Sequence, residues 1–150
     1  KNITQKVNKS FSFEVNIGEE TLQRTNLANY IAKNEKINLE KSLQIGDEIS
    51  GHIVYGHVDI TTNVNKIIQL NNSWEYHFEK NFYKNNKFIV EKGSISINGI
   101  SLTVARVEDN TFKISVIDHT FNHTNLKFLN KSDQVNVEFD YLARFIFNNE

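Results

Sequence analysis

The sequence predicts an all-β fold of the barrel or sandwich type, and two observations carry that prediction. Apolar and polar residues alternate on both sides of Asn98-Gly99, a dipeptide typical of tight hairpins because both positions require positive φ. Other short stretches rich in Ile, Val and Phe are separated by frequent turns, as in barrels and sandwiches. The chain has 150 residues, 39% of them apolar, which suffices for one domain or two small ones.

Each expected element follows from a local pattern. The strand-like segments are 52–62 (one strand or a pair), the hairpin 93–107, then 112–116 and 134–139. Short helical segments are expected at 20–30, 81–90 and 119–126. The clearest helix follows Asp140, a good N-cap, and places Leu142, Phe145 and Ile146 on one face.

Two regions of the chain resemble each other. Residues 11–27 match residues 110–126 at an offset of 99, so that Phe13 corresponds to Phe112 and Thr21 to Thr120. One position out of step, residues 37–40 match residues 135–138. A match of this extent predicts an internal duplication. The second copy has a long lead-in (51–107) and the first has almost none, so we expect one complete module plus the back end of another.

Composition argues against several classes of function. Lys and Arg (17) balance Asp and Glu (18), which leaves no basic stripe for nucleic acid. The longest apolar runs are far shorter than a membrane span. The chain contains no Cys, which removes disulfides, thiolate metal sites and a Cys nucleophile. It also contains no Met and begins with Lys1, so we expect that this is not its natural start.

Two histidine pairs suggest a metal site only weakly. His52 and His57 are five residues apart, and an odd spacing places side chains on opposite faces of a strand. Either the glycines around them break the strand or the two histidines have separate roles. His119 and His123 have a spacing that suits zinc on a helix, but their repeat mates are Glu and Arg. No metal is therefore expected.

Polar residues on the hairpin are candidates for ligand contact. Ser101 and Thr103 share one strand face, opposite Leu102. Such a pair lines a ligand pocket or forms the solvated outer face of a barrel strand. Lys92, just before the hairpin, reads by itself as a surface residue, and Asp140 as a helix cap. Spacing alone assigns no nucleophile, base or acid.

Taken together, these residues resemble the riboflavin synthase family of the α-subunit type, built from two lumazine-binding repeats. The carrying motifs span nearly the whole chain in order: 20–22 (ETL), 24–27 (RTNL), 50–59 (SGHIVYGHVD), 92–95 (KGSI), 98–104 (NGISLTV), 119–120 (HT), 123–126 (HTNL), and 135–138 (VNVE) before Asp140. The chain departs from the family in lacking the opening segment and the first hairpin. It also has Asn2 where Cys is frequent and Asp118 where Pro is common.

The resemblance implies a fold of tandem six-stranded Greek-key β-barrels with the first barrel incomplete. It divides the chain into 1–48 (the C-terminal part of the first barrel), 49–139 (the second barrel) and 140–150 (a short C-terminal helix). The implied reaction is the last step of riboflavin biosynthesis, a transfer of four carbons between two molecules of 6,7-dimethyl-8-ribityllumazine. Its products are riboflavin and 5-amino-6-ribitylaminouracil, and it needs no cofactor or metal.

The resemblance also implies a cytoplasmic homotrimer that associates with lumazine synthase, with each active site between barrels of two subunits. It assigns catalytic roles to His57, Lys92, Ser101 and Asp140. The other residues that it implies in substrate binding are Val15, Asn16, Ile17, Gly18, Glu19, Glu20, Thr21, Gly56, Val58, Leu102, Thr103, Ser115, Val116, Ile117, Asp118, His119 and Thr120.

Two other functions remain open. Relatives of this enzyme in luminous bacteria bind lumazine or flavin as fluorescent antennae without catalysis, and they tend to lose polar groups of the C-terminal barrel. His57, Lys92, Ser101, Thr103 and Asp140 are all present here, which favours the enzyme. The third interpretation is a stable structural remnant that does not trimerise.

Overall fold

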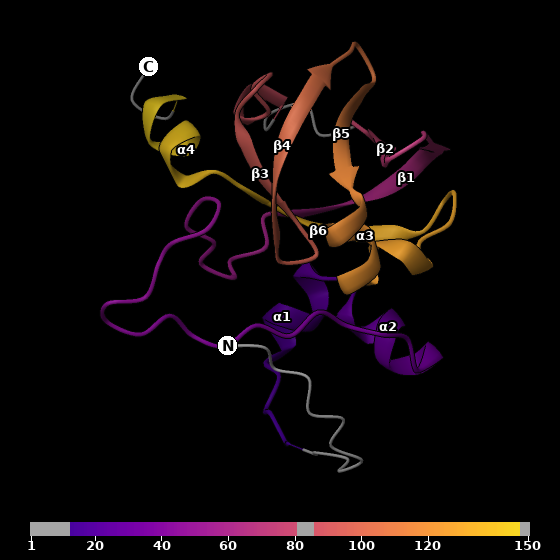
Figure 1. Cartoon of the computed structure of the whole chain (residues 1–150). Helices are drawn as coiled ribbons and strands as arrows, with labels where there is room; N and C mark the ends of the chain where they lie inside the picture. Colours follow the sequence, from indigo (N-terminus) through magenta and orange to yellow (C-terminus); the bar gives the residue numbers. More distant parts are fainter. Residues whose placement is uncertain (1–12, 81–85, 148–150) are drawn as a thin grey trace.

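A closed barrel of six antiparallel strands dominates the computed structural model, which describes residues 13–80 and 86–147 (Figure 1). The strands are β1 (Ile60–Gln69), β2 (Ser73–Glu79), β3 (Ser94–Ile97), β4 (Ile100–Val107), β5 (Thr111–Ile117) and β6 (Gln134–Phe139). Their order around the barrel is β1-β2-β5-β4-β3-β6. Because β3, β4 and β5 follow one another and β6 returns beside β3, the connection is a Greek key. The predicted all-β barrel is confirmed.

The barrel interior is filled by alternate residues of every strand. Buried Phe78, Phe112 and Phe139 contribute the largest apolar surfaces to one core cluster. The hydroxyl of Tyr76 donates to the carbonyl oxygen of Leu126 at 3.0 Å, and burial raises the Tyr76 pKa to about 12. This interior closes the barrel around side chains rather than around a channel.

The Asn98-Gly99 turn behaves as predicted. The two residues have φ values of 50° and 81°, and they join β3 to β4 in a two-residue hairpin. Ile97 pairs with Ile100 next to the turn, and Ser96 pairs with Ser101. This register places the polar side chains of β3 and β4 on the outer face of the barrel, as the alternation predicts.

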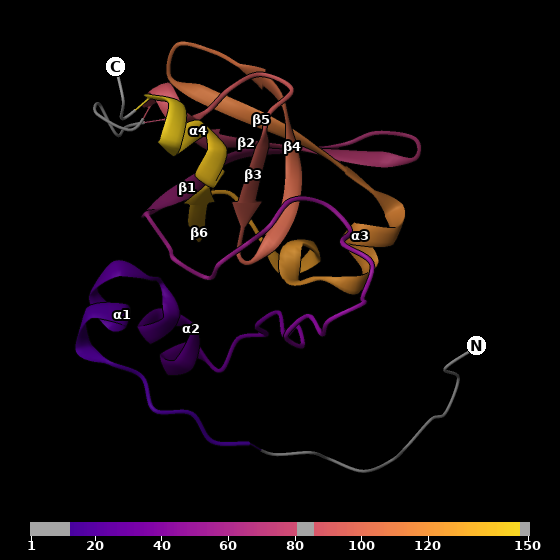
Figure 2. The same ribbon diagram turned by 90° about the vertical axis from the view of Figure 1, so that its left-hand side faces the viewer.

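Helices cover two sides of the barrel. They are α1 (Glu19–Arg24), α2 (Leu27–Lys33), α3 (Asp118–His123) and α4 (Tyr141–Phe147), with the 3-10 turns η1 (Asn86–Phe88) and η2 (Asn125–Phe128). Both ribbon views place α1 and α2 (indigo) below the barrel and α4 (yellow) beside its upper part (Figure 1, Figure 2). The helices expected near 20–30 and 119–126 and after Asp140 are confirmed. Of the helix expected at 81–90, only η1 forms in the described part, since 81–85 lie outside it.

The strand expected at 52–62 was wrong in its first eight residues. The extended backbone enters the barrel only at Ile60, because Gly51 and Gly56 adopt positive φ (84° and 79°) and bend the chain. Of the two alternatives left open for this motif, glycines that break the strand match the observed backbone. Strand β2 was not expected, although Trp74, Tyr76 and Phe78 alternate along it as in a half-buried strand.

Residues 13–59 form helices and irregular backbone but no strand, so the described residues contain one barrel rather than two. This segment docks on the barrel through Asn26, whose backbone N–H donates to Asn136 Oδ1 at 2.8 Å. The Asn26 side chain donates to the Gln134 carbonyl at 2.6 Å. Residues 2–4, expected as repeat mates of 101–103, lie outside the described residues. No described helix combines the length and apolar character needed to cross a membrane.

Candidate ligand-binding site

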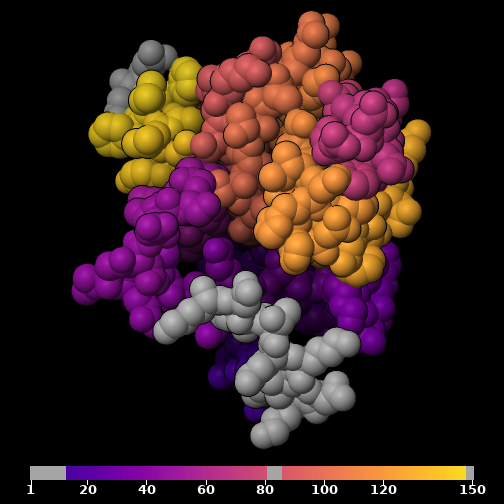
Figure 3. All heavy atoms as spheres, in the orientation of Figure 1, coloured from indigo at the N-terminus to yellow at the C-terminus, as the bar shows by residue number. Residues whose placement is uncertain are grey.

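The segment 51–59 lies across the outer face of three neighbouring strands. His52 contacts Ser101 on β4, and the backbone N–H of Tyr55 donates to Glu138 Oε1 on β6 at 2.7 Å. Glu138 and its β3 neighbour Ser96 are buried beneath the segment. In the space-filling view the chain that follows α2, drawn in purple, covers the barrel directly below α4 (Figure 3). The glycine- and histidine-rich motif is therefore a strap over the barrel wall.

Asp59 fastens the end of this strap to β6 and α4. Its backbone N–H donates to the Val137 carbonyl at 2.9 Å, and its Oδ2 accepts from the Phe139 N–H at 2.8 Å. Its Oδ1 forms an ion pair with Arg144 at 2.9 Å. Burial raises the Asp59 pKa, against the opposing influence of the Phe139 N–H and Arg144. Asp59 therefore has a structural role that couples the strap to the C-terminal helix.

Ser101 lies under the other end of the strap. Its Oγ accepts the backbone N–H of His52 at 3.0 Å and lies 2.7 Å from His52 Nδ1. A Cβ on Gly51 would stand 2.4 Å from the same oxygen. The positive φ of Gly51 and this close approach together require glycine. Gly51 and His52 thus pack closely around the Ser101 hydroxyl.

Beside Ser101, the barrel wall has a seam between β4 and β5. The last pair of residues in the ladder between these strands is Val104 and Ile114. The strands themselves extend further, since β4 begins at Ile100 and β5 continues to Ile117. In an antiparallel hairpin, residues alternate between facing one neighbour and the other. The backbone N–H and carbonyl of Val104 bond to Gly93 and Lys92 on the β3 side, so by this alternation the backbone groups of Ser101 and Thr103 turn toward the seam. The seam therefore offers backbone donors and acceptors beyond the end of the ladder.

The β5 side of the seam carries much of the predicted binding stretch. Ser115 and Ile117 are exposed, whereas the Val116 side chain is buried in the core, so a ligand would meet Val116 only through its backbone. Asp118 and His119 are exposed on α3, and Thr120 is half-buried. A stack of Trp74 on Phe121, with ring centroids 3.7 Å apart, holds α3 to β2. The stretch 115–120 thus lies at the β5 edge of the seam, with α3 held in place against β2.

The other predicted catalytic residues surround the same wall at different places. Lys92 is exposed in the turn before β3, with φ 67°, and its N–H donates to the Val104 carbonyl at 2.8 Å. Asp140 follows β6 on the far side of β3, and its Oδ1 caps α4 by accepting the Leu142 N–H at 2.9 Å. His57 is exposed on the strap, with its ring stacked 6.2 Å from that of Tyr55.

The predicted residues therefore divide into two groups. Those of the second repeat lie on the β3–β4 hairpin, the seam, the strap and the start of α4. Residues 15–21 instead lead into and begin α1, below the barrel, and all except half-buried Ile17 are exposed (Figure 1). No group of three His, Asp or Glu within 13–80 and 86–147 is arranged to hold a metal ion.

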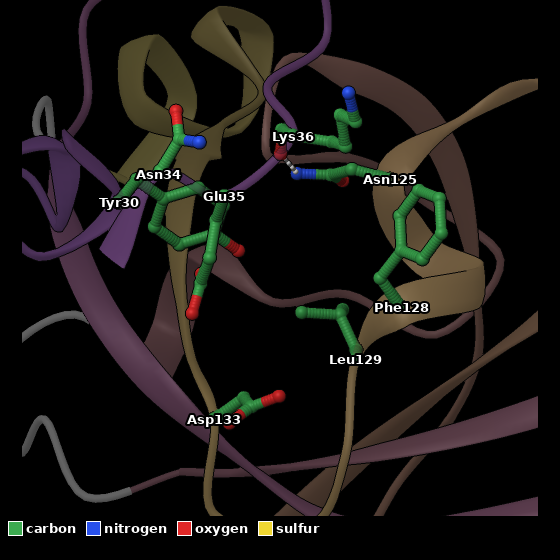
Figure 4. A pocket seen from close by; sticks show the side chains of 8 residues that line it. All are labelled: Tyr30, Asn34, Glu35, Lys36, Asn125, Phe128, Leu129 and Asp133. Carbon is green, nitrogen blue, oxygen red and sulfur yellow. Dashed lines mark hydrogen bonds between the residues drawn. The ribbon is translucent and has the colours of Figure 1, made fainter. Parts of the chain in front are cut away.

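A separate cavity of about 220 Å³ lies between the N-terminal segment and η2. Figure 4 shows Glu35 and Asp133 on two of its sides and the Asn125 amide donating to the Lys36 carbonyl at 3.3 Å. Its lining residues are Tyr30, Asn34, Glu35, Lys36, Asn125, Phe128, Leu129 and Asp133. None of them lies on β4 or β5 or was predicted to bind substrate, so this cavity is distinct from the seam.

Sequence reasoning missed two residues of the strap region. The sequence suggests His52 either as a weak metal-ligand candidate or as a residue with a role separate from that of His57, and its contact with Ser101 joins positions 49 apart in the chain. Glu138 was treated as part of a repeat motif, although it is buried and accepts a strap N–H. A charged residue inside an apolar alternation, as at Glu138, was the available signal. Nothing in the spacing pointed to His52.

Comparison with known proteins places the barrel in a family. The model of the lumazine binding domain matches residues 55–140. Riboflavin synthase of Actinobacillus pleuropneumoniae is 39% identical over 137 residues, which are 91% of this chain and 63% of that protein. Riboflavin synthase of Bacillus subtilis is 33% identical over 90% of this chain and 62% of its own length. The chain thus spans less than two thirds of these relatives.

Solved structures agree on the fold. LumP complexed with 6,7-dimethyl-8-(1'-D-ribityl) lumazine matches with a TM-score of 0.65 at 20% identity, covering 80% of this chain and 63% of that one. LumP complexed with riboflavin matches with a TM-score of 0.55 at 24% identity, over 63% of this chain and 50% of that one. With the barrel, the matched domain and the identities to curated relatives, this chain belongs to the lumazine-binding-domain family that includes the riboflavin synthases.

Proposed function

We propose that this chain is a riboflavin synthase that binds 6,7-dimethyl-8-ribityllumazine at the β4–β5 seam. The observation that carries the proposal is the end of the β4–β5 ladder beside Ser101, where backbone groups and a held hydroxyl meet at one edge. A pterin-like ring has carbonyl oxygens and ring nitrogens along its edge, and these match such backbone donors and acceptors. The names of the curated relatives support the same reaction.

The chemistry requires a proton acceptor and close alignment of two lumazines. Loss of a proton from the C7 methyl group gives a carbanion delocalised into the ring, which then attacks a second lumazine. His57 supplies an exposed imidazole, a side chain that can accept and donate a proton in general acid–base catalysis. Asp140, which follows β6, and Lys92, in the turn before β3, supply charged groups that polarise the attacking and leaving atoms. Holding the two rings face to face supplies much of the acceleration.

Assembly into a homotrimer would bring a second barrel to each seam. The face of α4 that carries Leu142, Phe145 and Ile146 is exposed, whereas Arg144 and Phe147 turn toward the barrel. The ring of Tyr55 on the strap packs at a tilt against that of Tyr141, with centroids 5.7 Å apart, which extends this apolar surface. An apolar helix face of this kind supports association with other copies. Association with lumazine synthase stays a prediction from the resemblance.

We also infer that residues 1–48 are the C-terminal part of a first barrel, related to 49–139 by duplication. The docking contacts are reciprocal: Asn26 N–H donates to Asn136 Oδ1, and Asn125 N–H donates to Asn38 Oδ1, both at 2.8 Å. Asn26 corresponds to Asn125 and Asn38 to Asn136 in the repeat. Contacts exchanged between equivalent residues are the mark of two-fold packing.

The second pair of docking bonds follows the same rule. The Asn26 amide donates to the Gln134 carbonyl, and the Asn125 amide donates to the Lys36 carbonyl. Gln134 lies 98 positions after Lys36, the offset of the neighbouring match. Four hydrogen bonds therefore obey one internal symmetry, which supports the duplication independently of sequence similarity.

A second candidate function is lumazine binding without catalysis. It is favoured by the single complete barrel among the described residues, since the reaction consumes two lumazines. The structural likeness to LumP is compatible with this candidate, although it shows only the fold.

One experiment separates the candidates. The chain is incubated with 6,7-dimethyl-8-ribityllumazine, and riboflavin is detected by its fluorescence after chromatography. We expect riboflavin, with single-turnover rates reduced at least about tenfold in Ser101→Ala and Asp140→Asn and unchanged in His77→Ala, on the outer face of β2. Tight binding without riboflavin would instead establish the binding-only function, and no binding would contradict both.

A further inference from the structure

Ser101 Oγ receives two contacts from one residue. The backbone N–H of His52 donates to it at 3.0 Å, and His52 Nδ1 lies 2.7 Å away. A hydroxyl oxygen has two acceptor positions and one proton. The backbone N–H occupies one acceptor position. If Nδ1 carries a hydrogen, it fills the other acceptor position and the Ser101 proton is left for a third partner. If Nδ1 carries none, it accepts the Ser101 proton itself.

The surroundings of the other ring nitrogen decide between the two tautomers. His52 Nε2 is buried and has no hydrogen-bond partner among the residues that the structure describes. If Nδ1 accepted the Ser101 proton, a neutral ring would carry its hydrogen on Nε2 as a buried donor without an acceptor. If Nδ1 carries the hydrogen, Nε2 is only an unused acceptor. Buried donors without partners are the rarer case, so the geometry favours Nδ1–H.

We propose that His52 is a positioning residue that makes Ser101 an obligate hydrogen-bond donor. With both acceptor positions filled by the N–H and Nδ1–H of His52, the Ser101 proton must point away from His52. The hydroxyl then recognises a carbonyl oxygen or an unprotonated ring nitrogen and disfavours an N–H group at the same place. The orientation of the hydroxyl follows from the contacts alone, and the identity of the ligand rests on the proposed function.

Gly51 also contributes to the orientation of the Ser101 hydroxyl. Its φ of 84° and the 2.4 Å that would separate a Cβ from Ser101 Oγ leave no room for a side chain. The backbone N–H of the next residue is thereby brought onto the hydroxyl. Gly51 and His52 thus act as one unit, which accounts for the first Gly-His of the strap separately from exposed His57.

The tautomer is read directly by nuclear magnetic resonance. Long-range correlation of ring nitrogens and carbon-bound protons in the unliganded chain, assigned with His52→Asn, distinguishes Nδ1–H from Nε2–H. We expect the Nδ1–H pattern for His52 at neutral pH. The ring signals of His77 in the same spectrum serve as an internal reference. An Nε2–H pattern would overturn the proposal whether or not the chain binds lumazine.

The consequence for binding is tested by titrating 6,7-dimethyl-8-ribityllumazine and following its fluorescence. Loss of one hydrogen bond in Ser101→Ala is expected to weaken binding by about tenfold. His52→Ala should weaken binding by a similar factor, and the double variant should be no weaker than either single one. His52→Asn, whose amide can donate from the position of Nδ1, should bind within about threefold of wild type.

His77→Ala is the matched control, because His77 lies on β2 away from the seam. Wild-type affinity in His52→Ala, or additive losses in the double variant, would overturn the positioning role. Absence of lumazine binding by the wild-type chain would contradict the proposed function, while the tautomer measurement would still decide the orientation of the hydroxyl.

Discussion

The two segments that we propose to be copies of one repeat have similar patterns but opposite surroundings. Phe112 on β5 is 0% exposed, whereas its mate Phe13 is 62% exposed. On β6, Val137 is 0% exposed and its mate Leu39 is 68% exposed. The same alternation forms strands in one copy and irregular backbone in the other. Strand patterns therefore fold only where neighbouring strands are available to cover the apolar face.

The docking asparagines show the contrary behaviour. Asn26 and Asn125 are both buried, and each donates its backbone N–H to an asparagine of the other copy. The contact between the two segments is thus made from both sides, whereas within residues 13–80 and 86–147 the apolar core lies on one side only. A polar contact requires only one partner, and it is present in both segments. A barrel core requires six strands, and among the described residues only the second segment has them.

The largest expected effect on stability distinguishes the barrel core from the equivalent position in residues 1–48. Phe112→Ala removes a fully buried ring and should lower the free energy of unfolding by about 3–5 kcal/mol. Phe13→Ala, at the equivalent exposed position, should change it by less than about 0.5 kcal/mol. Urea unfolding followed by Trp74 fluorescence measures both. A loss of several kcal/mol in Phe13→Ala would show that the first copy has a core of its own.

An intermediate effect tests the reciprocal interface. Asn26→Ala and Asn125→Ala each remove a buried side-chain amide that donates to a carbonyl oxygen of the other segment, which should cost about 1–3 kcal/mol. Asn125 also accepts from the Asn38 amide at 2.9 Å, so its loss should be the larger. Hydrogen exchange should accelerate in α2 for both variants, with the amides of β5 unchanged. Acceleration in one variant alone would contradict the two-fold relation.

The smallest effect concerns a matched pair of turns. Asn34 (φ 53°) and Ser132 (φ 73°) occupy equivalent left-handed positions at an offset of 98. Ser132→Gly should raise the free energy of unfolding by about 1 kcal/mol, and Asn34→Gly by less, because asparagine tolerates this conformation. Thermal unfolding provides the comparison. A loss of stability in Ser132→Gly would show that its side chain matters more than its backbone.

Much of the barrel could be predicted because its signals are local. Asn98-Gly99 requires positive φ and fixes the hairpin, and Asp140 caps α4 through its own side chain. The failure at 52–59 has a physical reason, since the Ile and Val pattern of this segment resembles a strand. Its backbone instead bonds to Ser101, Glu138 and β6, which are distant in sequence.

The candidate site was only partly accessible for the same reason. The resemblance identified Ser101 and the stretch 115–120, but not the contact between His52 and Ser101 or the end of the β4–β5 ladder. Both depend on how distant segments meet. Similarly, the exposure of residues 15–21 depends on which strands are present to cover them, which the alternation in that segment does not reveal.

The most direct test of this account is the number of lumazine molecules bound per chain. Equilibrium dialysis of the 150-residue chain against 6,7-dimethyl-8-ribityllumazine, with protein determined by amino-acid analysis, measures it at saturation. One complete barrel with one seam predicts one lumazine per chain, with an affinity about tenfold weaker in Ser101→Ala. Two per chain would show that residues 1–48 form a second site, and none would contradict the seam as a lumazine site.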